Sequence, residues 1–70
     1  MHKISQLVQG KGDSDTINLD GVSLPVKALK KLLEEGYENL KVFSDTKTIS
    51  TWGKNCTACF TEALLRERAK

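Results

Sequence analysis

The sequence predicts a small α+β domain in the order β-β-α-β-β-α, with a mostly antiparallel four-stranded sheet and two helices packed on one of its faces. The chain has 70 residues, of which 39% are hydrophobic and 29% charged, and this composition is typical of a globular protein. Short segments with alternating apolar residues indicate strands, and longer segments with apolar residues three or four positions apart indicate helices. The length favours a single domain over residues 1–70.

Two short strands are expected near the start of the chain. Residues 3–9 mix polar and apolar side chains, and residues 16–19 place Ile17 and Leu19 on the same side of an extended segment. The Asp-Gly pair at positions 20–21 is a strong turn signal. We therefore expect both strands to precede the first helix.

The clearest element is a helix that opens at residues 23–25 and ends before Gly36. Pro25 lies near the first helical position, where its missing N–H costs no hydrogen bond. Gly36 is expected to end the helix in a left-handed conformation. A right-handed crossover through this helix would place the strand at 16–19 beside the strand that follows. The apolar stripe consists of Val26, Leu29, Leu32 and Leu33.

A hairpin and a second helix are expected in the remaining chain. Residues 40–43 and 48–52 form the two strands, because the second is rich in β-branched and aromatic side chains and a polar turn separates them. Asn55 is a good N-cap for the helix. The apolar positions of this helix follow helical spacing and are Cys56, Cys59, Phe60, Ala63 and Leu64.

The motif Cys56-Thr57-Ala58-Cys59 is the only local motif with chemical content. A thiol pair at the start of a helix suits a redox couple, because helix N–H groups stabilise a thiolate. The spacing also supplies half of a zinc site, which His2 or a second copy of the chain would have to complete. The interpretation that we favour places both cysteines in the core as small apolar residues, and it predicts no metal and no cofactor.

The chain lacks the residues that common catalytic sites need. The single histidine, His2, is next to the first residue, where side chains seldom form a triad. No pattern indicates that the pKa values of two carboxyl groups are pushed apart, and no glycine-rich phosphate loop lies between a strand and a helix. We therefore expect a protein that is not an enzyme.

The basic residues raise an alternative, which is nucleic-acid binding. The formal net charge is only +2, but two groups of cations could merge if the helices lie side by side. Acidic residues interleave with them, so a solvated face is the simpler interpretation. The candidate phosphate contacts are Lys27, Lys30, Lys31, Arg66, Arg68 and Lys70.

The aromatic residues suggest a contact surface. In the strand at 40–43, Phe43 points away from Leu40 and Val42, and therefore lies on the sheet face opposite the helices. Alternation along the next strand places either Trp52 or Ile49 on that same face. A face that bears such side chains is a candidate interface. The candidate protein-binding residues are Phe43, Trp52, Tyr37 and Ile49.

These observations favour a small protein-interaction or regulatory module that acts through an exposed sheet face or edge strand. A thin core also favours a homodimer, because self-association buries further surface. Proteins of this size are common in phages and other mobile elements, where they inhibit or adapt a larger protein. No apolar run is long enough to span a membrane and no signal peptide is visible, so we expect a cytoplasmic protein with a protein partner.

Overall fold

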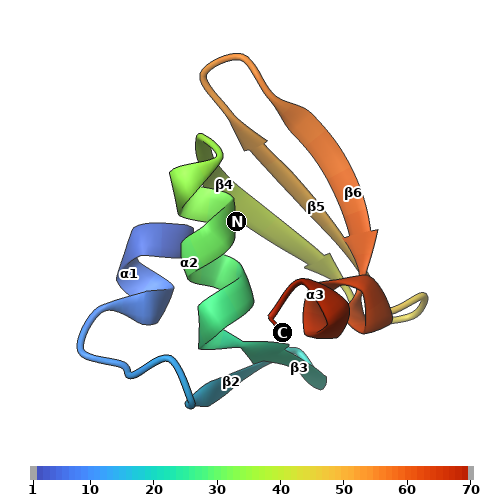
Figure 1. The fold of residues 1–70 in the computed structure, drawn as a ribbon. Helices are drawn as coiled ribbons and strands as arrows, with labels where there is room; N and C mark the ends of the chain where they lie inside the picture. Colours follow the sequence, from blue (N-terminus) through green and yellow to red (C-terminus); the bar gives the residue numbers. More distant parts are fainter. Residues whose placement is uncertain (1, 70) are drawn as a thin grey trace.

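The computed structural model describes residues 2–69 and shows an α+β fold with three helices and two antiparallel sheets (Figure 1). The class and the four-stranded antiparallel sheet agree with the prediction, but the order of elements is β-α-β-β-α-β-β-β-α. The helices are α1 (Ile4–Val8), α2 (Val26–Glu34) and α3 (Glu62–Arg68). The strands are β1 (His2–Lys3), β2 (Thr16–Leu19), β3 (Val22–Pro25), β4 (Tyr37–Phe43), β5 (Thr48–Gly53) and β6 (Thr57–Thr61).

The main sheet has the strand order β1-β4-β5-β6, and each neighbouring pair is antiparallel. The predicted hairpin is confirmed as β4 and β5, which pair from Tyr37 with Gly53 to Phe43 with Thr48. The predicted neighbour relation between residues 16–19 and 40–43 is wrong. Within the described chain β2 pairs with β3 alone, in a separate two-stranded sheet.

The Asp-Gly turn explains why β2 finds a local partner. Asp20 and Gly21 have φ angles of 51° and 84°, and two successive positive φ angles are typical of the type I′ turn that joins strands in a tight hairpin. Residues 22–25 continue as strand β3, with Val22 and Leu24 buried. The predicted helix start at residues 23–25 was therefore too early, because alternating burial outweighs the capping signal. Helix α2 begins at Val26.

The N-terminal segment is mainly helical, so the predicted strand over residues 3–9 is wrong. Only His2 and Lys3 are extended, and they pair with Leu40 and Asn39 of β4. Ile4, Leu7 and Val8 have the spacing i, i+3, i+4, which places them on one side of α1 and against the core. This helical spacing was present in the sequence beneath the polar-apolar mixture.

Helix α2 confirms the predicted amphipathic pattern. Val26, Leu29 and Leu32 are fully buried, and Leu33 is partly buried against the same core. The helix ends before Gly36, whose φ of 104° is a conformation that side chains with a Cβ rarely adopt. The glycine lets the chain turn directly from α2 into β4.

The predicted helix from Cys56 onward is wrong in its first half. Residues 57–61 form β6, which pairs with residues 48–52 of β5. Its side chains alternate, with Ala58 and Phe60 partly buried and Thr57, Cys59 and Thr61 exposed. Helix α3 begins only at Glu62, and its N-cap is Thr61, whose hydroxyl accepts a hydrogen bond from Leu64 N–H at 3.3 Å.

The core lies between one face of the main sheet and the helices. On that face Leu40, Ile49 and Thr51 are fully buried. All three helices and β3 contribute apolar side chains to the same cluster, so this sheet face is covered. The remaining buried members of the cluster are Ile4, Val22, Leu24, Ala28, Leu29, Leu32 and Leu65.

Candidate functional site

The opposite face of the main sheet, which we call the open face, is built from alternate residues of β4, β5 and β6. The register aligns these residues in three rows across the strands, because each row consists of directly paired positions. Across β4, β5 and β6 the face carries hydroxyl, amide and thiol groups, two aromatic rings and one lysine, and Lys3 of β1 extends it beside Asn39. Its rows are Asn39, Trp52 and Thr57; then Lys41, Ser50 and Cys59; then Phe43, Thr48 and Thr61.

Two aromatic residues lie on the open face, as the alternation predicts for Phe43. Phe43 is 44% exposed, and the Lys41 ammonium lies 5.2 Å from the centre of its ring. Trp52 is half-buried and belongs to the first row, whereas Phe43 belongs to the third. Four residues along a strand separate these rows by about 14 Å, so the rings mark opposite ends of the face.

The other two candidate binding residues do not lie on this face. Ile49 is fully buried in the core. Of the two residues that could have lain on the open face, Trp52 is therefore the one that does. Tyr37 is partly buried and packs edge-to-face against Phe60, with 6.1 Å between ring centres. Tyr37 lies before the strand expected at 40–43, and a bulge between Tyr37 and Asn39 separates it from the alternation of the rest of β4.

Strand β6 forms an outer edge of the sheet, and Figure 1 shows it as the outermost strand. Two main-chain hydrogen bonds flank its pairing with β5, from Gly53 N–H to the Cys56 oxygen at 2.9 Å and from Glu62 N–H to the Lys47 oxygen at 3.1 Å. Hydrogen-bonded and non-hydrogen-bonded pairs alternate in antiparallel strands, so Ala58 and Phe60 direct their main-chain groups toward β5.

It follows that Thr57, Cys59 and Thr61 direct main-chain groups away from the sheet. None of these N–H groups donates a main-chain hydrogen bond to another described element. This edge was not predicted from the sequence, because the apolar residues of 56–64 also fit the spacing of a helical stripe. The signal that could have found it is the alternation of threonine with Ala58 and Phe60.

The two cysteines are not core residues, so the interpretation that we favoured is wrong for their position. Cys59 is exposed on the open face, and Cys56 is partly exposed in the loop before β6. The Cys56 thiol donates a hydrogen bond to the Glu35 carbonyl oxygen at 3.6 Å, whereas the Cys59 Sγ lies 3.8 Å from the Ser50 hydroxyl oxygen. Each thiol therefore has a separate environment, and neither lies at a helix N-terminus.

Several of the candidate phosphate-binding cations form ion pairs with carboxylates of the chain. Lys30 pairs with Asp13 at 2.8 Å, Arg66 pairs with Glu62 at 3.1 Å, and Arg68 pairs with Glu35. The hydrogen bond and charge of Lys30 lower the pKa of Asp13. Helices α2 and α3 are in contact, and Arg68 of α3 pairs there with Glu35, the residue that follows α2.

Two of the remaining candidate cations are lysines of α2. Lys27 and Lys31 lie exposed on α2, without an ion pair to any residue in the described range. Lys70 lies outside the described residues.

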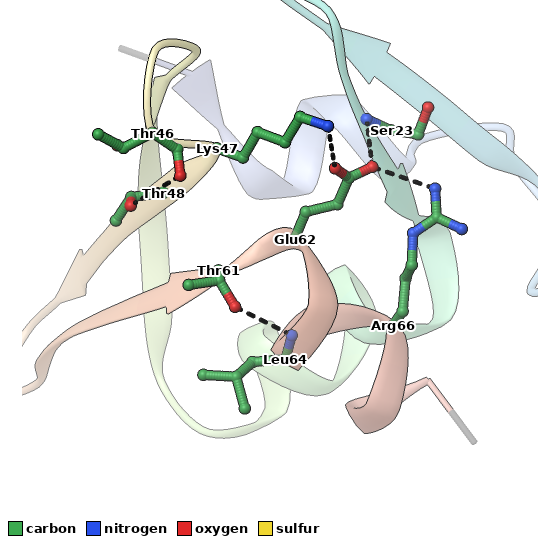
Figure 2. A network of polar contacts seen from close by, with 8 residues as sticks. All are labelled: Ser23, Thr46, Lys47, Thr48, Thr61, Glu62, Leu64 and Arg66. Carbon is green, nitrogen blue, oxygen red and sulfur yellow. Dashed lines mark hydrogen bonds and ion pairs between the residues drawn. The ribbon is translucent and has the colours of Figure 1, made fainter.

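A polar network around Glu62 joins α3 to two distant segments (Figure 2). One carboxylate oxygen accepts hydrogen bonds from Ser23 N–H at 3.3 Å and from Arg66 at 3.1 Å, and the other lies 4.0 Å from the Lys47 ammonium. The Arg66 hydrogen bond is the main cause that lowers the pKa of Glu62. Ser23 and Lys47 add to it, and partial burial opposes it. Among residues 2–69 no second carboxyl group takes part in this network, so its arrangement suits stabilisation of the fold.

A shallow cavity of about 370 Å³ lies between the first residues, the end of α2 and the start of β4. Ligand pockets are mostly apolar with a few polar groups. Here Leu33 is the one apolar side chain in the lining, so the cavity does not indicate a ligand class. The other lining residues are Lys3, Ser5, Glu38 and Asn39.

Across residues 2–69, histidine, cysteine and carboxylate side chains form no cluster of three or more that could hold a metal ion. His2, Cys56 and Cys59 are thus not brought together. No helix in the same range is long and apolar enough to cross a membrane. Comparison of the chain with protein-family models, with curated proteins and with solved structures found no match.

Proposed function

We propose that this chain is a small non-enzymatic protein-interaction module that binds a partner protein through the open face. The observation that carries the proposal is the exposure of Phe43, 44% accessible on a sheet face that no described element covers. Large aromatic side chains contribute more to protein interfaces than most residue types, because each buries a large rigid surface at small entropic cost.

The surroundings of Phe43 support a protein partner. Hydroxyl groups of Thr48, Ser50 and Thr61 can donate or accept hydrogen bonds, and Lys41 is the one charged residue of the nine. An interface with an aromatic anchor and a polar rim has this composition. None of the nine residues is a carboxylate, and Lys3 of β1 adds a second cation beside Asn39, which favours a partner whose contact surface carries acidic or neutral groups. Inhibition or adaptation of a larger cytoplasmic protein remains the role we propose for such a module.

Nucleic-acid binding by the helix cations has less support. Lys30, Arg66 and Arg68 each lie against a carboxylate, which offsets their charge and would have to be displaced by a phosphate. Lys27 and Lys31 alone form a small basic group. We therefore do not adopt this alternative.

The test compares two exposed apolar side chains on different surfaces. Leu64 on α3 is 47% exposed, close to the 44% of Phe43, and is not part of the open face. We expect Phe43→Ser to lose at least about tenfold in affinity for a partner captured from an extract of the source organism, and Leu64→Ser to keep wild-type affinity. Equal retention of the partner by both variants would refute the proposal, as would equal loss.

A further inference from the structure

The free edge of β6 has a geometry that is complementary to itself. Cys59 lies at the centre of the five-residue strand, with one threonine two positions before it and another two positions after it. Main-chain groups of all three residues point outward, whereas the C=O of Thr61 lies at the N-cap position and is available to begin the hydrogen bonding of α3. The groups left for a partner are the N–H and C=O of both Thr57 and Cys59, and the N–H of Thr61.

We propose that β6 pairs with β6 of a second copy of this chain, antiparallel and about a twofold axis at Cys59. In this register the two Cys59 residues exchange a pair of main-chain hydrogen bonds, and each Thr61 N–H donates to the Thr57 oxygen of the other copy. Four hydrogen bonds result, and registers centred on Thr57 or Thr61 would form fewer. The two four-stranded sheets become one continuous sheet with a doubled open face.

The side chains of β6 fit the same register. On the covered side, Ala58 of each copy lies opposite Phe60 of the other, so that a large residue meets a small one. Phe60 is already held by the Tyr37 ring and by Arg68, whose guanidinium lies 5.1 Å from the ring centre. On the open side, Thr57 lies opposite Thr61 of the other copy, a pairing that strands favour.

Strand β6 also lacks the features that prevent edge strands from pairing with another chain. Natural sheets protect their edges with charged residues, proline or bulges. Residues 57–61 contain no charge and no proline, and their pairing with β5 runs through five positions without a bulge. A second copy brings no like charges opposite each other across the new strand pair.

The equilibrium test uses Cys59→Lys with Ser50→Lys as its matched control. These residues are paired neighbours on the open face, so each variant adds the same charge to the same surface. Only the first places two lysines opposite each other in the dimer. In sedimentation equilibrium we expect the wild-type chain and Ser50→Lys to dimerise with the same dissociation constant, and Cys59→Lys to weaken it at least about tenfold.

Two results of that experiment would overturn the proposal. The first is a wild-type chain that stays monomeric up to about 1 mM. A dissociation constant of that size corresponds to a free energy of association of about −4 kcal/mol. The second is a dimer that Cys59→Lys leaves unchanged. Circular dichroism on both variants checks that the monomer is folded.

Crosslinking tests the register. Paired residues at a hydrogen-bonded position have Cα atoms about 5.5 Å apart, within the range of a disulfide. When diamide is added, two Cys59 thiols can give it two electrons and two protons and form one S–S bond. We expect rapid crosslinking of Cys56→Ser and none of Cys59→Ser. Crosslinking through Cys56 alone would exclude this register.

This self-pairing uses the β6 edge and does not require the partner protein proposed for the open face. Phe43 lies on β4, two strands away from the twofold axis. We expect Phe43→Ser to leave the dimerisation constant unchanged. Loss of dimerisation on Phe43→Ser would show that the open face, not the β6 edge, joins the two copies.

Discussion

At the scale of single residues, Gly53 is the glycine at which an added Cβ would meet another part of the main chain most closely, at Gly36. A Cβ on Gly53 would overlap the carbonyl oxygen of Gly36 and lie 3.0 Å from the Tyr37 Cα. These are main-chain atoms, so no rotamer change relieves the overlap. We expect Gly53→Ala to lower the free energy of unfolding by about 1–3 kcal/mol in urea titrations.

Gly12→Ala is the matched control for that substitution. Gly12 lacks a positive φ, and a Cβ there would meet only the Asp15 carboxylate at an ordinary 3.8 Å. We expect its free energy of unfolding to stay within about 0.5 kcal/mol of the wild type. Equal stability of the two variants would show that β5 and the α2–β4 turn do not approach as the structure has them.

The two faces of the sheet can be distinguished by single truncations. Ile49 is fully buried and Phe43 is 44% exposed, on strands that are direct neighbours. We expect Ile49→Ala to lower the free energy of unfolding by about 2–5 kcal/mol, because it removes three buried carbon atoms and leaves a cavity. Phe43→Ala should cost about 1 kcal/mol or less, measured in the same urea titration. A larger cost for Phe43 would mean that the open face is covered.

At the scale of elements, α3 depends on a cap that the sequence interpretation placed elsewhere. The Thr61 hydroxyl accepts from Leu64 N–H, and Thr61 is the last residue of β6. We expect Thr61→Ala to cost about 1 kcal/mol of stability and Thr61→Ser to restore most of it. Thr57→Ala, on the same strand and face without a cap, should have a smaller effect. Thermal unfolding followed at 222 nm compares the three variants.

The elements that could be predicted are those in which the apolar residues fit either helical or strand spacing, but not both. Helix α2 has nine residues with a regular apolar stripe, and the β4–β5 hairpin is rich in β-branched side chains. Both were expected from the sequence, although β4 begins at Tyr37, three residues before the expected start, and α2 begins at Val26, after the expected opening at residues 23–25. The open face could be predicted from the hairpin, because alternation along β4 places Phe43 and Leu40 on different faces of the sheet.

The elements that could not be predicted are short ones in which two periods compete. In residues 56–64 the apolar positions satisfy helical spacing, yet Ala58 and Phe60 also alternate, and pairing with β5 decides for a strand. In residues 22–25 the turn at Asp20 and Gly21 brings the segment beside β2, and this pairing favours a strand over a helix start. Both decisions come from hydrogen bonds to a neighbouring strand, which a single segment of sequence does not reveal.

At the scale of the whole molecule, Glu62 joins three segments that are far apart in the chain, and this makes stability depend on pH. Its pKa lies below the ordinary 4.5, so the folded chain binds a proton less readily than the unfolded chain does. The carboxylate therefore stabilises the fold fully above about pH 4.5, and this contribution is lost as the pH falls through the lowered pKa. Lys30 also lowers the pKa of Asp13, so the contribution of the Asp13 carboxylate to stability is likewise lost as the pH falls.

We therefore expect the wild-type chain to lose stability between about pH 5 and pH 3, and Glu62→Gln to lose less over that interval while being less stable at pH 7. The amide can keep the Ser23 hydrogen bond but loses the attraction of Arg66 and Lys47. Glu67→Gln is the control, because Glu67 lies on the same helix without an ion pair to another described residue, and its pH profile should follow the wild type. Urea midpoints measured at half-unit pH steps compare the three chains. Parallel profiles for wild type and Glu62→Gln would mean that the Glu62 network does not hold α3 against β3 and the β4–β5 loop.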